Sequence, residues 1–291
     1  MSHADVQATG PGMRRRSAWR RLARHSGFVV GAAIVACVVA AAVVSLFWTP
    51  YPIDVVDVRG RFAGPSAAHW LGTDQLGRDV VSMLMSGAVT SLTVGAVAVG
   101  IGAGIGVPLG SLAAARPGLV SEAVLRLGDL TLAFPAIVTA VMITSLWGPG
   151  AVNAILAIAI FNVPVFARLT RGTALTVWTL DYIQAARAAG FGPVRIMARH
   201  VFPNVAGIII VQATIQFALA ILAEAGLSYL GLGAQPPAAS WGRMLNEAQT
   251  LLYFAPQLAI YPGVAIVLSV LGLNLLGDGL RDVLDPRLRG R

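Results

Sequence analysis

Residues 26–48 read SGFVVGAAIVACVVAAAVVSLFW, which is 23 consecutive residues without a charged side chain. At about 1.5 Å per residue, a helix of this length crosses the hydrocarbon core of a bilayer, which is about 30 Å thick. Phe47, Trp48 and Tyr51 place aromatic side chains at one end, as membrane interfaces favour. The stretch is longer than the apolar region of a cleaved signal peptide, about 7–15 residues. It therefore predicts a retained first transmembrane helix.

The composition extends this prediction to the whole chain. Of the 291 residues, 56% are hydrophobic and 12% are charged, whereas soluble domains carry about 25% charged residues. A chain this apolar needs lipid around most of its surface, where helices satisfy their own backbone groups. We expect an all-α, polytopic membrane protein with six transmembrane helices. The predicted spans are 26–48, 88–115, 128–147, 151–167, 205–228 and 257–277.

The arginines predict the orientation of these spans. The net charge of +8 comes from 21 arginines, because the chain contains no lysine. With both termini in the cytoplasm, 17 arginines lie on the cytoplasmic side, where membrane proteins concentrate positive charge. Only Arg59, Arg61, Arg78 and Arg243 then lie outside. Arginines clustered between apolar runs also argue against nucleic-acid binding, which needs a continuous basic face.

This topology divides the chain into segments on the two sides of the membrane. The region after the first helix and its outer segment, 88–278, contains the other five spans. In chain order we expect a cytoplasmic arginine-rich tail (1–25), the first transmembrane helix (26–48), an extracytoplasmic segment (49–87), a transmembrane domain (88–278) with a cytoplasmic loop (168–204) and an extracytoplasmic loop (229–256), and a cytoplasmic C-terminus (279–291).

Several kinds of catalytic and metal site have no counterpart in the sequence. Without lysine, the chain lacks the glycine-rich loop ending in Gly-Lys-Ser/Thr that holds ATP phosphates. The single cysteine, Cys37, cannot form an intrachain disulfide, and the four histidines do not share a metal-ligand spacing. We expect no catalytic, cofactor or metal residues here. ATP and Mg²⁺, if used, would bind to partner subunits.

Two features inside the predicted spans have specific interpretations. Gly102, Gly106 and Gly110 recur every four residues on one helix face, which predicts the close approach of a neighbouring helix. Glu224 is a carboxylate well inside a predicted span, and such a group is paired or faces a water-filled cavity. One interpretation places Glu224 on a translocation path, and the other makes it a structural partner of a neighbouring helix or subunit.

The cytoplasmic loop predicts a helix–glycine–helix elbow over residues 181–203. Asp181 and Gln184 resemble a capping box that opens a short helix, and Gly190 can adopt the left-handed conformation that ends it. Pro193 is tolerated in the first turn of a second helix, and Pro203 is expected to mark the return to the membrane. A short helix with exposed alanines is suited to a groove of another protein.

The spacing of this elbow resembles the EAA loop in membrane subunits of bacterial ATP-binding-cassette (ABC) importers. Gln184-Ala185-Ala186 is followed at the family's spacing by Gly190 and Pro203, although glutamine replaces the usual glutamate. The resemblance implies that the elbow couples the chain to an ATPase. The implied coupling residues are Asp181, Gln184, Ala185, Ala186, Arg187, Gly190 and Pro203.

Three further motifs are similar to those of dipeptide, oligopeptide and nickel permeases, specifically the C-type subunit. These motifs are LGTDQLGRD at 71–79, SYLGLGAQPP at 228–237 with SWG at 240–242, and NLLGDGLRD at 274–282 with DPR at 285–287. The resemblance covers roughly residues 20–290. It implies a type I ABC-importer permease fold in the bacterial inner (plasma) membrane.

This resemblance also implies a function and a set of partners. The chain would be one permease subunit of an ATP-driven importer that moves short peptides, di- or oligopeptides, into the cytoplasm. The implied partners are a second, B-type permease subunit, two ABC ATPase subunits or domains that hold ATP and Mg²⁺, an extracytoplasmic peptide-binding protein, and membrane lipid.

Two alternatives remain open at this point. A nickel or other small-solute permease of the same family would favour histidine or carboxylate ligands along its path, and the predicted spans contain no histidine. A secondary carrier or channel would need intramembrane charges for ion coupling, and only Glu224 lies deep. Both features favour the peptide importer.

Overall fold

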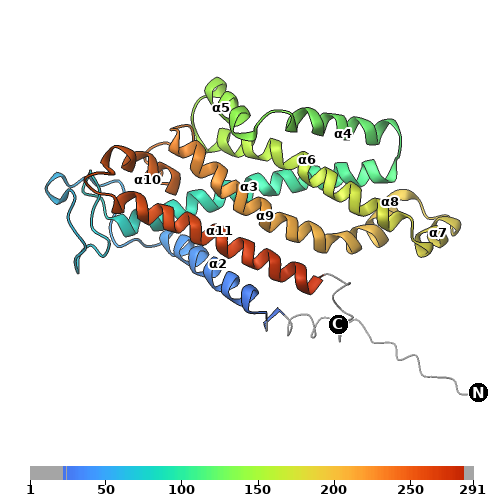
Figure 1. Ribbon diagram of the computed structural model, residues 1–291, viewed down its shortest axis with the longest axis horizontal. Coiled ribbons are helices and arrows are strands. Elements are labelled where there is room, and N and C mark those ends of the chain that lie inside the picture. The colour runs from blue at the N-terminus through green and yellow to red at the C-terminus, as the bar shows by residue number, and fades with distance from the viewer. Residues whose placement is uncertain (1–21, 24, 285–291) are drawn as a thin grey trace, which may run out of the picture.

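The computed structural model describes residues 22–23 and 25–284, and these form a bundle of long helices (Figure 1). Most of the predicted tail 1–25 and the last part of the segment 279–291 lie outside the described residues. The helices are α2 (Ser26–Ser45), α3 (Val80–Ala115), α4 (Leu119–Leu132), α5 (Ala136–Trp147), α6 (Ala151–Trp178), α7 (Asp181–Ala188), α8 (Pro193–Ile196), α9 (Phe202–Tyr229), α10 (Trp241–Ala248) and α11 (Gln257–Leu284), with 3-10 turns at Val58–Gly60 and Gln249–Leu251 and a π turn at Met197–Val201.

Six spans are present when one bent helix pair is counted as a single span. Within the described residues, five helices are long and apolar enough to cross a membrane, and α4 and α5 together form the sixth candidate span. The prediction of one continuous helix over 128–147 was wrong, because α4 and α5 meet at 81°. Pro135 lies at this bend with an extended ψ of 128°, and a proline disfavours helical backbone in the residue before it.

Three spans are clearly longer than hydropathy predicted, and one of them is α11, which continues past position 277 to Leu284. Helix α3 begins at Val80 rather than at position 88, because the Asp79 carboxylate accepts a hydrogen bond from the Ser82 backbone N–H at 2.8 Å and caps the helix there. Helix α6 continues past position 167 to Trp178. Pro164 lies inside α6 and is buried, where packing against neighbouring helices tolerates it.

The glycines of α3 bring it close to α6, as predicted. A Cβ atom added to Gly102, Gly106 or Gly110 would lie less than 3.0 Å from atoms of Asn162, Val163 or Ala167, respectively. Real Cβ atoms do not approach so closely, so α6 occupies the space that larger side chains would need. This face makes α3 and α6 a tightly packed pair in the centre of the bundle.

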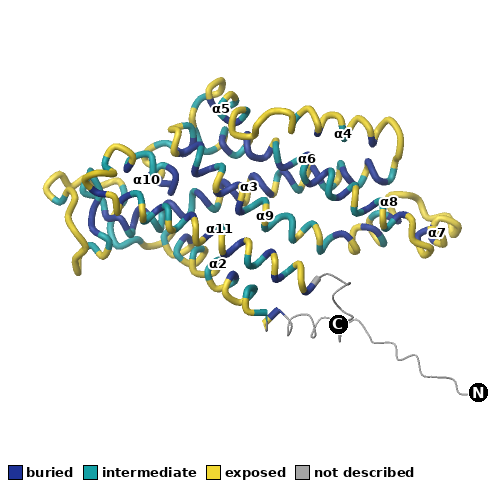
Figure 2. The backbone as a smooth tube through the Cα atoms, in the orientation of Figure 1, coloured by how far each residue is buried: buried dark blue, intermediate teal, exposed yellow. Residues whose placement is uncertain are grey.

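Helix α2 packs on the outside of the bundle against α11 (Figure 1). An added Cβ at Gly31 would lie less than 3.0 Å from backbone atoms of Gly272 and Leu276. Within α2 only Gly31 and Ala42 are buried. Figure 2 shows exposed positions along α2, α4 and α5. Large apolar side chains such as those of Val29 and Leu146 are among the exposed ones. An apolar surface of this extent is suited to lipid.

The two loops that carry motifs lie at opposite ends of the bundle (Figure 1). Helices α7 and α8 form one end. Helix α10 and the segment between α2 and α3 form the other end, which we call the α10 end. The long helices α3, α6 and α9 run between the two ends, so they connect the elbow with the α10 end.

The seam between α3 and α6 predicts a contrast between two glycines of the same helix. Gly106→Leu places its side chain against α6 and should lower the free energy of unfolding by about 1–3 kcal/mol, as overpacking typically does. Gly104→Leu is the matched control, because a Cβ at Gly104 meets no atom within 4 Å. Thermal unfolding in detergent measures both. Equal melting temperatures for the two variants would contradict the packing described.

Candidate functional site

The elbow is a compact structure built around a glycine turn. Helix α7 ends in a Schellman motif, in which the Phe191 N–H donates to Ala186 O at 3.1 Å and the Gly190 N–H donates to Arg187 O at 2.9 Å. Gly190 has a φ of +82°, which confirms the predicted left-handed turn. Helix α8 then begins with Pro193, also as predicted. The turn fixes the angle at which α7 stands off the bundle.

The predicted capping box at the start of α7 was wrong. Leu180 is the N-cap residue and offers no side-chain cap, while Asp181 is the first helical residue, where its carboxylate suits the positive end of the helix dipole. The side chain of Gln184 turns back and donates to Trp178 O at 3.0 Å. Because α6 ends at Trp178, this carbonyl lacks a helical partner, and glutamine supplies the donor that an ionised glutamate would lack.

A small core holds α7 against the ends of α6 and α9. Ile183, Ile196 and Val201 are almost completely buried there. The Arg187 guanidinium lies 4.7 Å from the ring centroid of Trp178, a cation–π contact. The inner face of α7 is therefore packed against the bundle.

The outer face of α7 remains free within the described part of the chain. Asp181, Gln184 and Ala185 are exposed, whereas Ala186 is buried beneath them. Five of the predicted coupling residues, including Arg187, therefore lie on this one short helix, and all of these except Ala186 are exposed. The structure brings these residues together as the spacing predicted, while their contact with an ATPase stays a prediction.

Pro203 lies in the first turn of α9, at the return to the membrane as expected, but the backbone stays helical there. The helical run continues from Pro193 to Tyr229, with the π turn at Met197–Val201 just before the proline. The Phe202 N–H donates to Met197 O, five residues back. Proline lacks an N–H and crowds the preceding turn of an α-helix, and a wider π turn relieves this crowding. The elbow is thus continuous with α9.

The α10 end is held together by a charged cluster that sequence reasoning missed. Arg78 donates to the Asp74 carboxylate at 2.6 Å and to the Glu247 carboxylate at 2.5 Å, and Arg243 donates to Glu247 at 2.9 Å. Burial acts to lower the pKa of Arg78, but the two carboxylates outweigh it and hold this pKa above its ordinary value. The cluster ties the segment before α3 to α10.

Sequence spacing alone could not have found this cluster, because Arg78 and Glu247 are 169 positions apart. The only available signal was that Asp74 and Arg78 belong to the LGTDQLGRD motif. Within that motif the Asp74 side chain also accepts from the backbone N–H groups of Leu76 and Arg78, at 2.8 and 2.9 Å. Asp74 therefore stabilises the loop formed by the motif itself, in addition to bonding Arg78, which contacts α10.

Glu224 lies near the α10 end of α9 and is buried, with 1% of its surface exposed. The hydroxyls of Ser91 on α3 and Ser228 on α9 donate to its two carboxylate oxygens at 2.8 and 2.7 Å. Ser91 in turn accepts a 3.4 Å bond from the Trp241 N–H, the first residue of α10. These contacts favour the structural interpretation of Glu224, and its place on a translocation path stays a prediction.

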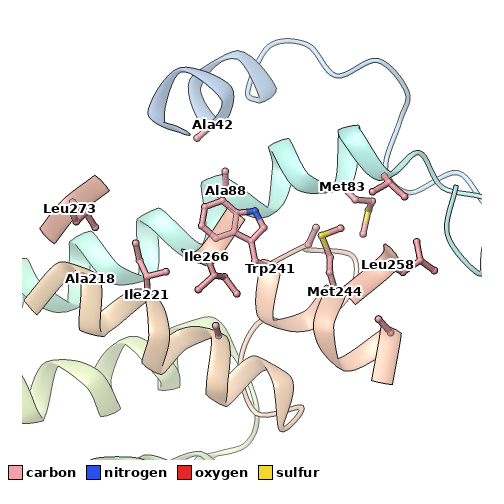
Figure 3. Close-up of a cluster of buried hydrophobic side chains, with 14 of the residues drawn as sticks. Ala42, Met83, Ala88, Ala218, Ile221, Trp241, Met244, Leu258, Ile266 and Leu273 are labelled. Carbon is pink, nitrogen blue, oxygen red and sulfur yellow. The ribbon is translucent and has the colours of Figure 1, made fainter. Parts of the chain in front are cut away.

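Hydrophobic packing completes this junction. The indole of Trp241 lies among side chains from α3, α9 and α11, including Ala88, Ile221 and Ile266 (Figure 3). Its Nε1 donates to Leu84 O at 3.0 Å, so the buried indole has its hydrogen bond. Helix α10 is therefore held to α3 and α9 by Trp241 and by the hydrogen bonds that Glu224 accepts from Ser91 and Ser228.

Two family models match the chain. Residues 106–290 match the model described as binding-protein-dependent transport system inner membrane component, and residues 14–65 match the N-terminal TM domain of oligopeptide transport permease C. The chain belongs to this family, as a C-type ABC-importer permease. The permease is a multi-pass protein of the bacterial inner (plasma) membrane. This assignment replaces the alternative of a secondary carrier or channel.

Curated relatives cover nearly the whole permease. It is 42% identical to the glutathione transport system permease protein GsiD of Pectobacterium atrosepticum over 275 residues, which is 94% of this chain and 91% of the relative. The protein of the same name from Escherichia coli O6:K15:H31 is 42% identical over 94% of this chain and 90% of its own length.

Solved structures share the fold. Two inward-facing crystal forms of the MetNI methionine ABC transporter match with TM-scores of 0.58 and 0.57, at 23% and 24% sequence identity. Each match covers 69% of this chain and 96% of the other. The expected importer permease fold is therefore confirmed.

The two interpretations of Glu224 predict different behaviour for two substitutions. Glu224→Gln can still bond both serines, so the variant should fold and assemble normally, whereas Glu224→Leu strands two buried hydroxyls and should cost about 1–3 kcal/mol for each. Thermal unfolding measures the stability of both variants, and uptake of the transported solute measures their activity. Normal uptake by Glu224→Gln would remove this carboxylate from the path, and loss of uptake by this variant, with normal stability, would contradict a purely structural role.

Proposed function

We propose that this permease moves short peptides of the size of glutathione into the cytoplasm, as one subunit of an ATP-driven importer. The supporting observation is the 42% identity over 94% of the chain to permeases named for glutathione transport. Glutathione is a tripeptide, so its chemistry is within the range of the di- and oligopeptides expected from the sequence motifs. The polar groups described above within α3 and α9 are the hydroxyls of Ser91 and Ser228 and the carboxylate of Glu224, which are compatible with a polar organic solute.

The proposed orientation places the elbow in the cytoplasm together with both termini. Helix α7 would insert its exposed face into a groove of an ABC ATPase, and ATP and Mg²⁺ would bind there rather than on this chain. Two ATPases and a B-type permease subunit would complete the membrane complex. The α10 end would then face outward, where the ordered surface around Arg78 and α10 would receive a peptide-loaded binding protein.

Continuity of the helices supports a mechanical form of coupling. The elbow is packed on α6 and α9, and α9 runs to Glu224 and the α10 end. When the ATPases close, a displaced α7 would carry α9 with it as a lever, and the permease would rock between inward-open and outward-open states. Helix α9 and the surface at the α10 end would therefore move together.

The substrate class is tested by uptake in a strain that lacks this permease. Uptake of labelled dipeptide, tripeptide and glutathione should fall to background in the deletion strain and return with the gene. It should also depend on ATP, because ATP binding drives the conformational change. An excess of unlabelled peptide is the competition control. Unchanged uptake of all three compounds in the deletion strain would contradict the proposed substrate class.

The coupling role of the elbow is tested by two neighbouring glycines. Gly190→Val forces a β-branched residue to a φ of +82°, which costs about 1–3 kcal/mol and should distort the turn after α7. Gly192→Val is the control, since Gly192 has a φ of −69° and open space around it. We expect Gly190→Val to lower peptide uptake per ATP hydrolysed in proteoliposomes, and Gly192→Val to leave it unchanged. Equal uptake per ATP in both variants would contradict the proposed coupling.

A further inference from the structure

Three amide side chains form a hydrogen-bonded ladder near the middle of α6 and α9. Gln212 donates to the Gln216 side-chain oxygen at 3.3 Å, Gln216 donates to the Asn162 side-chain oxygen at 2.6 Å, and Asn162 donates to Ile158 O at 3.1 Å. We call Gln212, Gln216 and Asn162 the amide ladder. It connects α9 with α6, and all three residues lie in the central part of these 28-residue helices.

One end of the ladder is fixed. Asn162 is buried, with 3% of its surface exposed, and it lies directly beneath Gly102 of α3, where any larger side chain on α3 would collide with it. Its amide is therefore held at the seam between α3 and α6. Gln216 is partly exposed and bridges from this fixed amide to the other glutamine.

The other end of the ladder is open. Gln212 is partly exposed, and among the described residues its amide forms one hydrogen bond, to Gln216. A primary amide can form up to four. A partly exposed amide with free donor and acceptor capacity is unfavourable against lipid tails, where polar groups cost several kcal/mol if they stay unpaired, on the order of the amide transfer penalty. The open end therefore needs water or another polar group beside it.

We propose that the amide ladder lines the aqueous path of this permease and binds the backbone amides of the transported peptide. This rests on the proposed function and adds a site to it. Each ladder amide offers a donor and an acceptor, the same pair that a peptide bond offers. A peptide can exchange hydrogen bonds with Gln212 and Gln216 one at a time, so that neither partner is left unpaired.

The chemistry of the ladder also sets its selectivity. The ladder carries no charge, so it neither repels peptides of either sign nor traps them by strong ion pairing. Its position near the middle of the helices is where importers and carriers place substrate between their two open states. Hydrogen bonds that are individually weak permit release on the inner side.

Water access to the open end can be measured with a single cysteine. The substitution Cys37→Ala removes the only thiol of the chain. In that background, the reactivity of the new thiol in Gln212→Cys reports whether water reaches the ladder. Val267→Cys is the control, because Val267 is an apolar residue near the centre of α11 with 63% of its surface exposed, which suits lipid. Both variants are labelled in the assembled complex with a small, hydrophilic methanethiosulfonate reagent applied from both sides.

We expect Gln212→Cys to react at least about ten times faster than Val267→Cys, because a thiol in lipid is held in its unreactive protonated form. A saturating tripeptide should slow the reaction at Gln212→Cys alone. Equal rates at the two positions would overturn the proposal, and would place Gln212 against lipid or the second permease subunit. Fast labelling without protection by tripeptide would overturn the assignment of the ligand.

Transport kinetics supply a second test. Gln212→Leu removes one hydrogen bond to the peptide and should raise the KM for tripeptide uptake about three- to tenfold. Ile215→Leu places the same side chain at an exposed position of α9 outside the ladder and away from the α10 end, and should leave this KM unchanged. An unchanged KM in Gln212→Leu would contradict the proposal.

Failure of the proposed function gives a different result. If the Cys37→Ala complex moves no tripeptide, glutathione or dipeptide, the substrate class is wrong. The labelling rate of Gln212→Cys without peptide would still decide whether the ladder faces water, because that measurement requires no transport.

Discussion

The close approach of α3 and α6 is the constraint on which the rest of the structure depends. Lipid offers no hydrophobic gain for joining two helices, so the pair is held by contact between backbones that three glycines of α3 permit. This seam holds Asn162 beside α3, and the two helices continue from it, α6 to Trp178 beneath the elbow and α3 back to Asp79 at the α10 end. The positions of both ends of the permease therefore depend on the contact between α3 and α6.

The parts of the fold that could be predicted from the sequence are those that depend only on the apolar surroundings of the bilayer. Uncharged runs gave the number of spans, because a bilayer of nearly fixed thickness demands a minimum apolar length. Helix ends were less predictable, since α6 continues as a helix through Arg168 and Arg171 after it has left the apolar region. Pro135 and Pro203 were ambiguous for a related reason: one accompanies a sharp bend, whereas the other is absorbed by a π turn.

The candidate sites divide in the same way. Gly190 was predictable, because a helix end needs a left-handed residue and glycine adopts that conformation most readily. The bond from Gln184 to Trp178 O was not, because it depends on where α6 ends. Pairs such as Arg78 with Glu247 and Gln216 with Asn162 join distant positions, and only the packing of whole helices brings them together.

The π turn before Pro203 inserts one residue more than an α-helix would hold in the same length. Each residue of an α-helix rotates the chain by about 100°, so this surplus sets the phase between the elbow and α9. A chain with one residue fewer at Met197–Val201 could keep every membrane-facing side chain of α9 in place while pointing α7 toward a different side of the bundle. The length of the Met197–Val201 turn therefore determines the direction in which α7 points from an otherwise unchanged transmembrane domain.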